Sequence, residues 1–309
     1  MTNPKICVVG ASNIDLVSYA PRLPKLGETL PGNRFQMGFG GKGANQAVMA
    51  ALLGATVTMV TKVGQDIFGQ DYLNHYQQLG FDTRYVTMTD AAATGVAPIW
   101  VDEGSGNNAI IVVTGANDLL SPADVEAARE AILRAQVLLC QWESPLESTL
   151  AALRIAQAAG VTTIFNPAPA RADLPAEAYQ LSDILCPNET ETELLTGRPV
   201  ATLAEAEAAA HILLARGARQ VILTLGERGS LFVTADGATQ VPTTAVQAID
   251  TTGAGDAFCG SLAYFLAAGQ PILRAMAHAN YVAAMSVQKP GTQSSFPHRE
   301  TLPTMLFHE

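Results

Sequence analysis

The sequence predicts an α/β fold: a doubly wound, mostly parallel sheet with helices on both faces, together with a small β-sheet lid. Through most of the 309 residues, short apolar runs typical of buried strands alternate with helical segments. Two extended, turn-rich segments interrupt this alternation and predict the lid. Hydrophobic residues make up 48% of the chain, enough for a large core and too many for a mainly disordered protein.

The core elements follow in chain order, and turn residues or caps mark many of their ends. The run KICVVG predicts the first buried strand, and glycines after helical patterns end helices. Ser121 followed by Pro122 is typical of a capped helix start. We expect strands over 5–10, 56–64, 137–143, 162–168, 183–188, 220–226 and within 230–242, and helices over 44–54, 68–80, 121–135, 145–159, 201–217, 255–268 and 271–288.

Two insertions predict the lid. Residues 11–40 are extended and broken by proline and glycine, where a helix should follow the first parallel strand. ATGVAPIWVD and NNAIIVVTG flank EGSGN, which is a hairpin signal, and this hairpin can pair with the first insertion. We therefore assign residues 1–10, 41–93 and 117–309 to an α/β core that binds nucleotide and substrate, and residues 11–40 and 94–116 to the lid.

Composition excludes several classes of function. The net charge of -10 leaves no basic surface for nucleic acid. No apolar run reaches the roughly 18 residues of a transmembrane helix, and no secretory signal is seen. The histidines are scattered without metal spacing. We expect a soluble cytoplasmic protein without a membrane partner, whose cysteines are buried free thiols: Cys7, Cys140, Cys186 and Cys259.

Polar residues gather where the predicted strands end. Ligands of such sheets bind beyond the carboxyl ends of the strands. A loop cap explains any one of these polar groups, but all of them together predict a binding edge. The groups are Asn13 with Asp15, Glu143, Asn188 with Glu191, Thr224 to Gly229, and Asp250 to Asp256.

The segment FGGKGANQ (39–46) places glycines and Lys42 at a predicted helix start. Glycines let a ligand approach the backbone, the helix N-terminus offers free N–H groups, and Lys42 adds positive charge. The spacing is not that of a Walker A loop. The alternative interpretation is a glycine hinge between lid and core, and both can hold together.

The segment DTTGAGD (250–256) predicts the reaction centre. Gly253, Ala254 and Gly255 can direct N–H groups at an oxyanion, and Asp256 can accept the proton of an attacking hydroxyl. The alternative is that Asp256 only caps the helix, but a cap needs no glycine on both sides of Ala254.

Other motifs are weaker or absent. The acidic run 189–193 is typical of the first turn of a helix, although Glu191 could bind a magnesium-bound water. No GxSxG elbow accompanies Ser144, which disfavours serine hydrolysis. The first strand ends in GASNID rather than GxGxxG, which disfavours a dinucleotide-dependent oxidoreductase.

The chain resembles the ribokinase-like (PfkB) family of carbohydrate kinases along nearly its whole length. GFGGKGANQA and DTTGAGDAF are its most specific segments, and NPAPA, PNETE and GTQSS are most similar to ribose-specific members. The resemblance implies ATP-dependent phosphorylation of the 5-hydroxyl of D-ribose. Asp256 would be the base, and Gly253, Ala254 and Gly255 the anion hole.

The resemblance also implies two sets of binding residues. The sugar would be bound by Asn13, Asp15, Gly41, Lys42, Asn45 and Glu143, together with Asp256. The nucleotide would be lined by Asn188, Thr224, Gly226, Gly229, Gly255 and Asn280. Some relatives carry a histidine where this chain has Asn280.

Metal ions and a partner chain are implied in the same way. Magnesium would bind through a water at Glu191, and the lids of two chains would interlock in a homodimer. A monovalent cation, usually potassium, would be bound largely by backbone oxygens of Asp250, Thr252, Ser286, Lys289, Gly291 and Ser295.

Two further candidate functions stay open. A kinase for 2-deoxyribose or another small sugar or nucleoside would use the same residues. The deoxyribose branch of the family carries methionine at the position of Asn13, whereas Asn13 can contact a hydroxyl that deoxyribose lacks, which favours ribose. A catalytically silent sugar- or nucleotide-binding sensor would not need Asp256 as a base.

Overall fold

The larger of two sheets carries the core of the fold. The computed structural model describes residues 3–105 and 107–308. In this part of the chain, the larger sheet is built from β1 (Lys5–Val9), β4 (Thr56–Gly64), β5 (Asp82–Thr89), β8 (Val137–Gln141), β9 (Thr162–Asn166), β10 (Ile184–Leu185), β11 (Gln220–Thr224), β12 (Ser230–Thr234) and β13 (Gly237–Val241).

The strand order of this sheet is β13-β12-β11-β10-β9-β8-β1-β4-β5. Neighbouring strands from β11 across to β5 are parallel, and only β12 and β13 add an antiparallel edge. The parallel strands therefore place their carboxyl ends along one edge of the sheet. This confirms the mostly parallel sheet expected from the alternation of apolar runs and helices.

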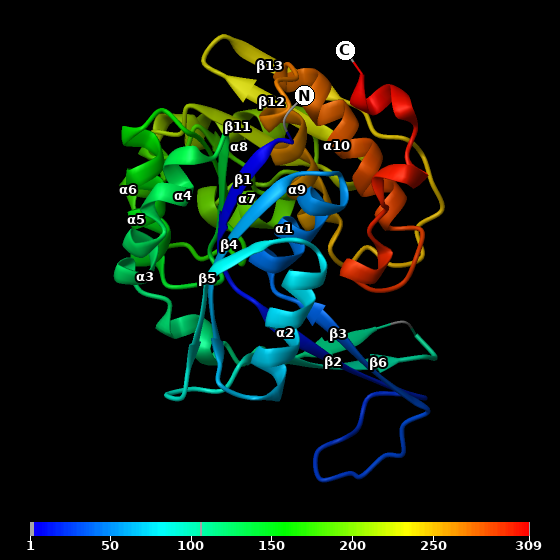
Figure 1. Cartoon of the computed structure of the whole chain (residues 1–309). Coiled ribbons are helices and arrows are strands. Elements are labelled where there is room, and N and C mark those ends of the chain that lie inside the picture. Colours follow the sequence, from blue (N-terminus) through cyan, green and yellow to red (C-terminus); the bar gives the residue numbers. More distant parts are fainter. Residues whose placement is uncertain (1–2, 106, 309) are drawn as a thin grey trace.

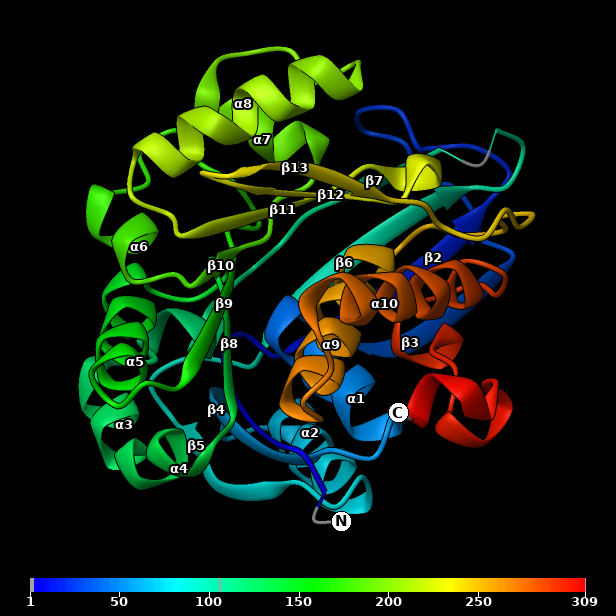
Figure 2. The same cartoon turned by 90° about the horizontal axis from the view of Figure 1, so that it is seen from above.

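Helices cover both faces of the sheet (Figures 1 and 2). One face packs against α1 (Lys42–Leu52), α2 (Ile67–Gln78), α9 (Ala254–Ala267) and α10 (Ile272–Ser286). The other packs against α3 (Pro122–Ala127), α4 (Arg129–Arg134), α5 (Leu146–Ala158), α6 (Ala176–Gln180), α7 (Glu189–Thr196) and α8 (Leu203–Ala215). Short 3-10 turns occupy Gly115–Leu119, Gly226–Arg228, Gln293–Ser295, Arg299–Thr301 and Thr304–Phe307.

The two insertions form a second sheet, which projects from one end of the core (Figure 1). Its strands are β2 (Asn13–Ala20), β3 (Arg34–Gly40), β6 (Gly95–Asp102) and β7 (Asn108–Ile110), in the order β3-β2-β6-β7. β6 and β7 pair antiparallel, as the hairpin signal predicts, and β6 pairs with β2 of the first insertion. Position 106 of the predicted turn lies outside the described residues.

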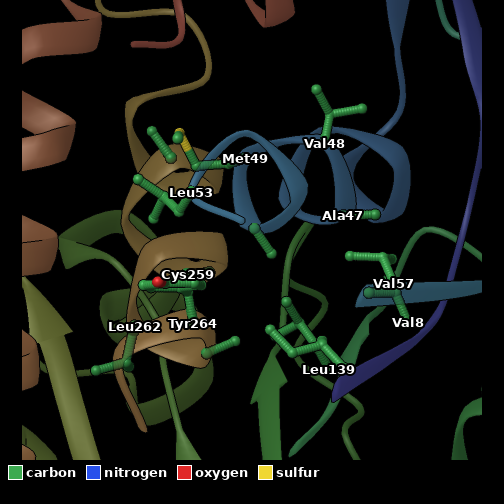
Figure 3. Close-up of a cluster of buried hydrophobic side chains, with 14 of the residues drawn as sticks. Val8, Ala47, Val48, Met49, Leu53, Val57, Leu139, Cys259, Leu262 and Tyr264 are labelled. Atoms are coloured by element: carbon green, nitrogen blue, oxygen red, sulfur yellow. The ribbon is translucent and has the colours of Figure 1, made fainter. Parts of the chain in front are cut away.

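Helices α1 and α9 pack closely against each other beside the sheet. Figure 3 shows Met49 of α1, and Leu53 directly after this helix, in the same buried cluster as Leu262 of α9 and Leu139 of β8. The close approach depends on Gly260, because a Cβ there would overlap the carbonyl oxygen of Gln46 and lie 2.9 Å from the Cβ of Met49. The packing fixes the position of the N-terminus of α9 relative to α1.

Several predicted elements differ from the structure. The helix expected over 121–135 is two helices, because the N–H of Ala128 donates to Val125 at 3.0 Å in a tight turn that contains neither glycine nor proline. The strand expected over 183–188 is only two residues long. We did not predict α6, or the edge strand β5, whose largely polar sequence DTRYVTMT reflects its partly exposed position.

Among the described residues, no helix combines the length and the hydropathy that crossing a lipid bilayer requires.

We expect Gly260→Ala to lower the free energy of unfolding by about 1–3 kcal/mol, because the added methyl group overpacks the contact between α1 and α9. Urea titration measures this change. Gly255→Ala in the same helix is the matched control, since a Cβ there meets no atom within 4 Å. Equal destabilisation by both variants would contradict this account of the helix contact.

Candidate active site

Asp256 lies in the first turn of α9, and the residue is only 6% exposed. The helix begins after Gly253, whose φ of 77° is in the left-handed region. A Cβ at this position would also lie 2.5 Å from Cγ2 of Thr292. Glycine is therefore required for the chain to turn into the helix at this point, and this turn sets the position of Asp256.

Two amide side chains from α1 orient the carboxylate of Asp256. Asn45 Nδ2 donates to one carboxylate oxygen and Gln46 Nε2 to the other, both at 2.9 Å. A buried carboxylate needs such donors to offset the loss of water. Two bonds leave the carboxylate with further acceptor capacity, so it can still accept a proton from a hydroxyl.

A second layer of amides supports these two residues. Gln46 accepts a hydrogen bond from Gln141 at 2.7 Å and donates to Asn166 at 3.1 Å. Asn45 accepts one from Gln293 at 2.9 Å. Sequence reasoning missed Gln46, Gln141, Asn166 and Gln293 as members of the site. The sequence feature that could have indicated them is that each is an uncharged amide within a motif already quoted: GANQ, QWE, NPAPA or GTQSS.

The N-terminus of α9 presents free backbone donors beside Asp256. Within residues 3–105 and 107–308, no acceptor is found for the N–H groups of Gly255 and Asp256. Ala254, which we expected to offer its N–H to an oxyanion, donates it to Thr251 O at 3.2 Å. Of the three predicted donors, Gly253 and Gly255 thus keep open N–H groups among the described residues, and Asp256 adds another.

A cavity of about 130 Å³ opens in front of these donors. It brings together several of the residues predicted from separate motifs, including Lys42, Asp256 and Glu191. Its lining consists of Lys42, Asn166, Ala168, Cys186, Asn188, Glu191, Thr224, Gly253, Gly255, Asp256 and Cys259.

Opposite charges meet around this cavity. The backbone N–H of Lys42 donates to Glu143 at 2.7 Å. Burial acts to lower the pKa of Lys42, but nearby carboxylates, chiefly Asp256 and Glu143, outweigh it and raise that pKa overall. Burial also raises the pKa of Glu143 and of Glu191. A charged lysine among buried acids is suited to attract and hold phosphate oxygens.

The predicted sugar-binding residues lie where the lid meets the core. Asn13 begins β2, opposite Gly40 and Gly95, and its Oδ1 accepts a hydrogen bond from Asn117 at 2.8 Å. Asp15 lies beside Gly40, where a Cβ would come within 2.6 Å of the Asp15 carboxyl carbon.

Glycine at position 41 likewise lets the start of α1 approach the backbone of β2 closely. Its φ is 89°, and a Cβ there would be 2.7 Å from the backbone nitrogen of Asn13.

Burial, followed by the charges of Glu143 and Asp256, raises the pKa of Asp15 to about 7. Asp15 therefore stands as a partly desolvated acid at the edge of the site, where a ligand hydroxyl could donate to it.

The predicted nucleotide residues are only partly brought together. Asn188 caps α7 in a reciprocal pair with Glu191 and faces the cavity with Thr224. Gly226 and Gly229 lie in the turn after β11, outside the cavity lining. Asn280 is buried, and its Nδ2 donates to Ser230 Oγ at 3.0 Å and to Val241 O at 2.9 Å. Its side chain thus joins α10 to the antiparallel edge of the sheet.

The residues predicted to bind a monovalent cation come from the loop before α9 and from the segment that runs from the end of α10 to the 3-10 turn at Gln293–Ser295. Asp250 joins these two segments, because its carboxylate accepts hydrogen bonds from the N–H groups of Thr252 and Gly291, both at 2.9 Å. Burial opposes but does not cancel the effect of these bonds, which lower the pKa of Asp250. Ser286 and Ser295 each donate to a nearby backbone carbonyl, and Lys289 is exposed.

Comparison with known proteins identifies similar chains. The family model described as pfkB family carbohydrate kinase matches residues 3–299. A ribokinase of Mus musculus is 47% identical, covering 98% of this chain and 94% of its own, and a deoxyribokinase of Salmonella typhi is 42% identical, covering 94% and 95%. An Arabidopsis thaliana ribokinase structure, complexed with ribose and ATP, has a TM-score of 0.91 at 31% identity and covers 100% of both chains.

We expect Asp15→Asn to raise the melting temperature of the ligand-free protein more at pH 8 than at pH 5. The folded-state pKa of about 7 lies above the ordinary 3.8, so folding favours the protonated carboxyl. That stabilisation is complete below about pH 4 and is lost as the pH rises through 7. Asparagine never ionises and avoids this loss.

Thermal denaturation at the two pH values tests the expectation. The exposed Asp90→Asn is the control and should show no such difference. An equal shift for Asp15→Asn at both pH values would contradict the raised pKa.

Proposed function

Because the chain belongs to the pfkB family of carbohydrate kinases, we propose that it transfers the terminal phosphoryl group of ATP to the 5-hydroxyl of D-ribose, giving D-ribose 5-phosphate and ADP. The observation that carries this proposal is the Asp256 carboxylate. It is oriented by Asn45 and Gln46 at a helix N-terminus with open N–H groups.

The chemistry follows from the contacts of Asp256. Its carboxylate would accept the proton of the sugar hydroxyl as the new O–P bond forms, and ADP would leave with the electrons of the broken P–O bond. The open N–H groups of Gly253, Gly255 and Asp256, with the dipole of α9, would stabilise the charge on the transferred phosphoryl oxygens. Lys42, at the same cavity, would add a positive charge.

The sugar would lie between the lid and Asp256. Asn13, Asp15 and Glu143 offer donors and acceptors suited to a polyol, and Gly41 leaves room for it beside the backbone. Lys42 and Asn45 complete the proposed sugar site. ATP would enter past Asn188 and Thr224, with Gly226 and Gly229 shaping the turn that faces its base. Asn280 would support that wall through its bonds to β12 and the end of β13.

Two metal ions fit residues of the chain. Glu191 lines the cavity, and one of its oxygens accepts a hydrogen bond from Asn188 N. Its other oxygen has no partner in the described part of the chain and would be left for a magnesium-bound water. A potassium ion would suit the loops that Asp250 ties together, with backbone oxygens of Thr252, Ser286, Lys289, Gly291 and Ser295 as its ligands. Magnesium would supply charge neutralisation at the phosphates.

We also propose a cytoplasmic homodimer whose subunits meet through their lids. The sheet formed by residues 11–40 and 94–116 leaves large apolar side chains exposed, including Phe35 at 63% and Ile111 at 55%. Exposed apolar residues on a small sheet are suited to a second copy of the same sheet. The remaining residues, 1–10, 41–93 and 117–309, would be the catalytic core.

A second candidate is 2-deoxy-D-ribose as the acceptor, because a deoxyribokinase is among the similar proteins. Asn13 favours ribose. Its Oδ1 is engaged by Asn117, and no partner is found for its Nδ2 among the described residues, so this group can donate to a sugar hydroxyl. A site built to bond a hydroxyl rejects an analogue that lacks it.

We expect Asp256→Asn to lower kcat by about 100- to 10,000-fold, because asparagine cannot accept the proton of the sugar hydroxyl. A coupled assay of ADP release with ribose, magnesium and potassium measures this. The exposed Asp236→Asn is the control. Turnover near that of the wild type, with the fold intact by circular dichroism, would disprove the assignment of the base.

We expect the wild-type chain to prefer ribose over 2-deoxyribose in kcat/KM. Asn13→Met should reduce this preference by more than about tenfold, because it removes the donor to the sugar hydroxyl. The same assay, run with each sugar and with no sugar, tests both statements. Preference of the wild type for deoxyribose would keep the mechanism and overturn the substrate.

A further inference from the structure

Two cysteines face each other at the cavity beside Asp256. Cys186 follows β10 and Cys259 lies in α9, and their sulfur atoms are 3.7 Å apart. Both are free thiols, and each is 1% exposed. Both also line the cavity in front of the N-terminus of α9. Neither thiol has a role in the proposed phosphoryl transfer.

The separation of the two sulfur atoms matches that of a bound zinc ion. Two thiolates at about 2.3 Å from a tetrahedral zinc ion lie about 3.8 Å apart. A disulfide would need the sulfur atoms to approach to about 2.05 Å, much closer than the 3.7 Å seen here. The two sulfur atoms, now joined by a hydrogen bond from Cys259 to Cys186, thus already stand at the separation that bidentate binding of zinc needs.

We propose that Cys186 and Cys259 form a binding site for Zn²⁺ at the floor of the active-site cavity, and that zinc bound there inhibits the enzyme. On binding, each thiol releases its proton to solvent and each sulfur forms one bond to zinc. The two thiolate charges neutralise the ion. Glu191 and Asp256 at the same cavity add negative charge that favours a cation, against the positive charge of Lys42 there.

The site is open rather than structural. Within residues 3–105 and 107–308, no third histidine, cysteine, aspartate or glutamate completes a metal-binding group. Water from the cavity would fill the remaining coordination positions, and zinc would exchange readily. A closed site with four protein ligands would instead have stabilised the fold.

Inhibition follows from the position of Cys259 in α9. It lies three residues after Asp256, and side chains at this spacing are neighbours on one helix face. A zinc ion on Cys259 would therefore place a positive charge close to the carboxylate that the proposed mechanism uses as a base. It would also occupy part of the cavity that we assign to the phosphates. This part of the inference rests on the proposed function, whereas the binding itself does not.

Direct binding is the first test. Reduced full-length protein, without nucleotide, is titrated with Co²⁺ as a spectroscopic probe and with Zn²⁺ against a chromophoric chelator. We expect a thiolate-to-cobalt charge-transfer band that zinc abolishes. Cys186→Ser and Cys259→Ala should each remove the band and weaken zinc binding by more than about tenfold. Cys140→Ala is the matched control, because Cys140 is equally buried but lies away from the cavity.

Inhibition is measured in parallel, with magnesium and ATP in excess. We expect zinc to inhibit the wild type and Cys140→Ala, and each cavity variant to need more than about tenfold more zinc. Absence of the cobalt band in the wild type, or equal zinc affinity in all variants, would overturn the binding site. Inhibition that a reductant reverses and a chelator does not would also overturn it, because it indicates a disulfide.

Equal inhibition of all four proteins would overturn the inhibitory role, since zinc would then act on ATP or magnesium. The binding data do not depend on any sugar being the substrate. A cobalt band in a protein without kinase activity would thus keep the metal site and reject only the proposed function.

Discussion

The burial of one carboxylate, Asp256, constrains much of the structure around it. A carboxylate removed from water is costly unless donors replace its hydration, and the amides of Asn45 and Gln46 provide them. These donors belong to α1, whereas Asp256 belongs to α9, about 210 residues later in the chain. Everything that brings the two helices together therefore also serves to orient the carboxylate, including the glycine contact at position 260.

The buried acids around the cavity lower the stability of the ligand-free protein when they are ionised. Burial raises the pKa of Asp15, Glu143 and Glu191, which shows that the folded chain stabilises their ionised forms poorly. Lys42 is the cation that lies among these acids at the cavity. Ligands that donate hydroxyl groups or bring cations would relieve this cost, as expected for a site shaped for binding rather than for stability.

The lid and the core meet through close backbone packing. Asn117 donates to Asn13 at the first residue of β2, and Gly40 and Gly95 flank Asn13 in the neighbouring strands. A side chain at Gly95 would collide with both asparagines. Residues that we assign to sugar recognition, such as Asn13, therefore lie where the two sheets join. A movement of the lid would change their positions directly.

Sequence alone determined the fold class, the lid and the principal motifs of the site, because apolar periodicity and turn residues are local properties. It identified DTTGAGD and GGKGANQ, which the tertiary structure places together. Only the tertiary structure decided that Gln46, Gln141, Asn166 and Gln293 form one network with Asp256. The tertiary structure also decided that the N–H of Ala254 donates to Thr251 O and that Cys186 contacts Cys259. Such contacts join residues far apart in the chain, and uncharged amides and thiols leave no periodic pattern that reveals their partners.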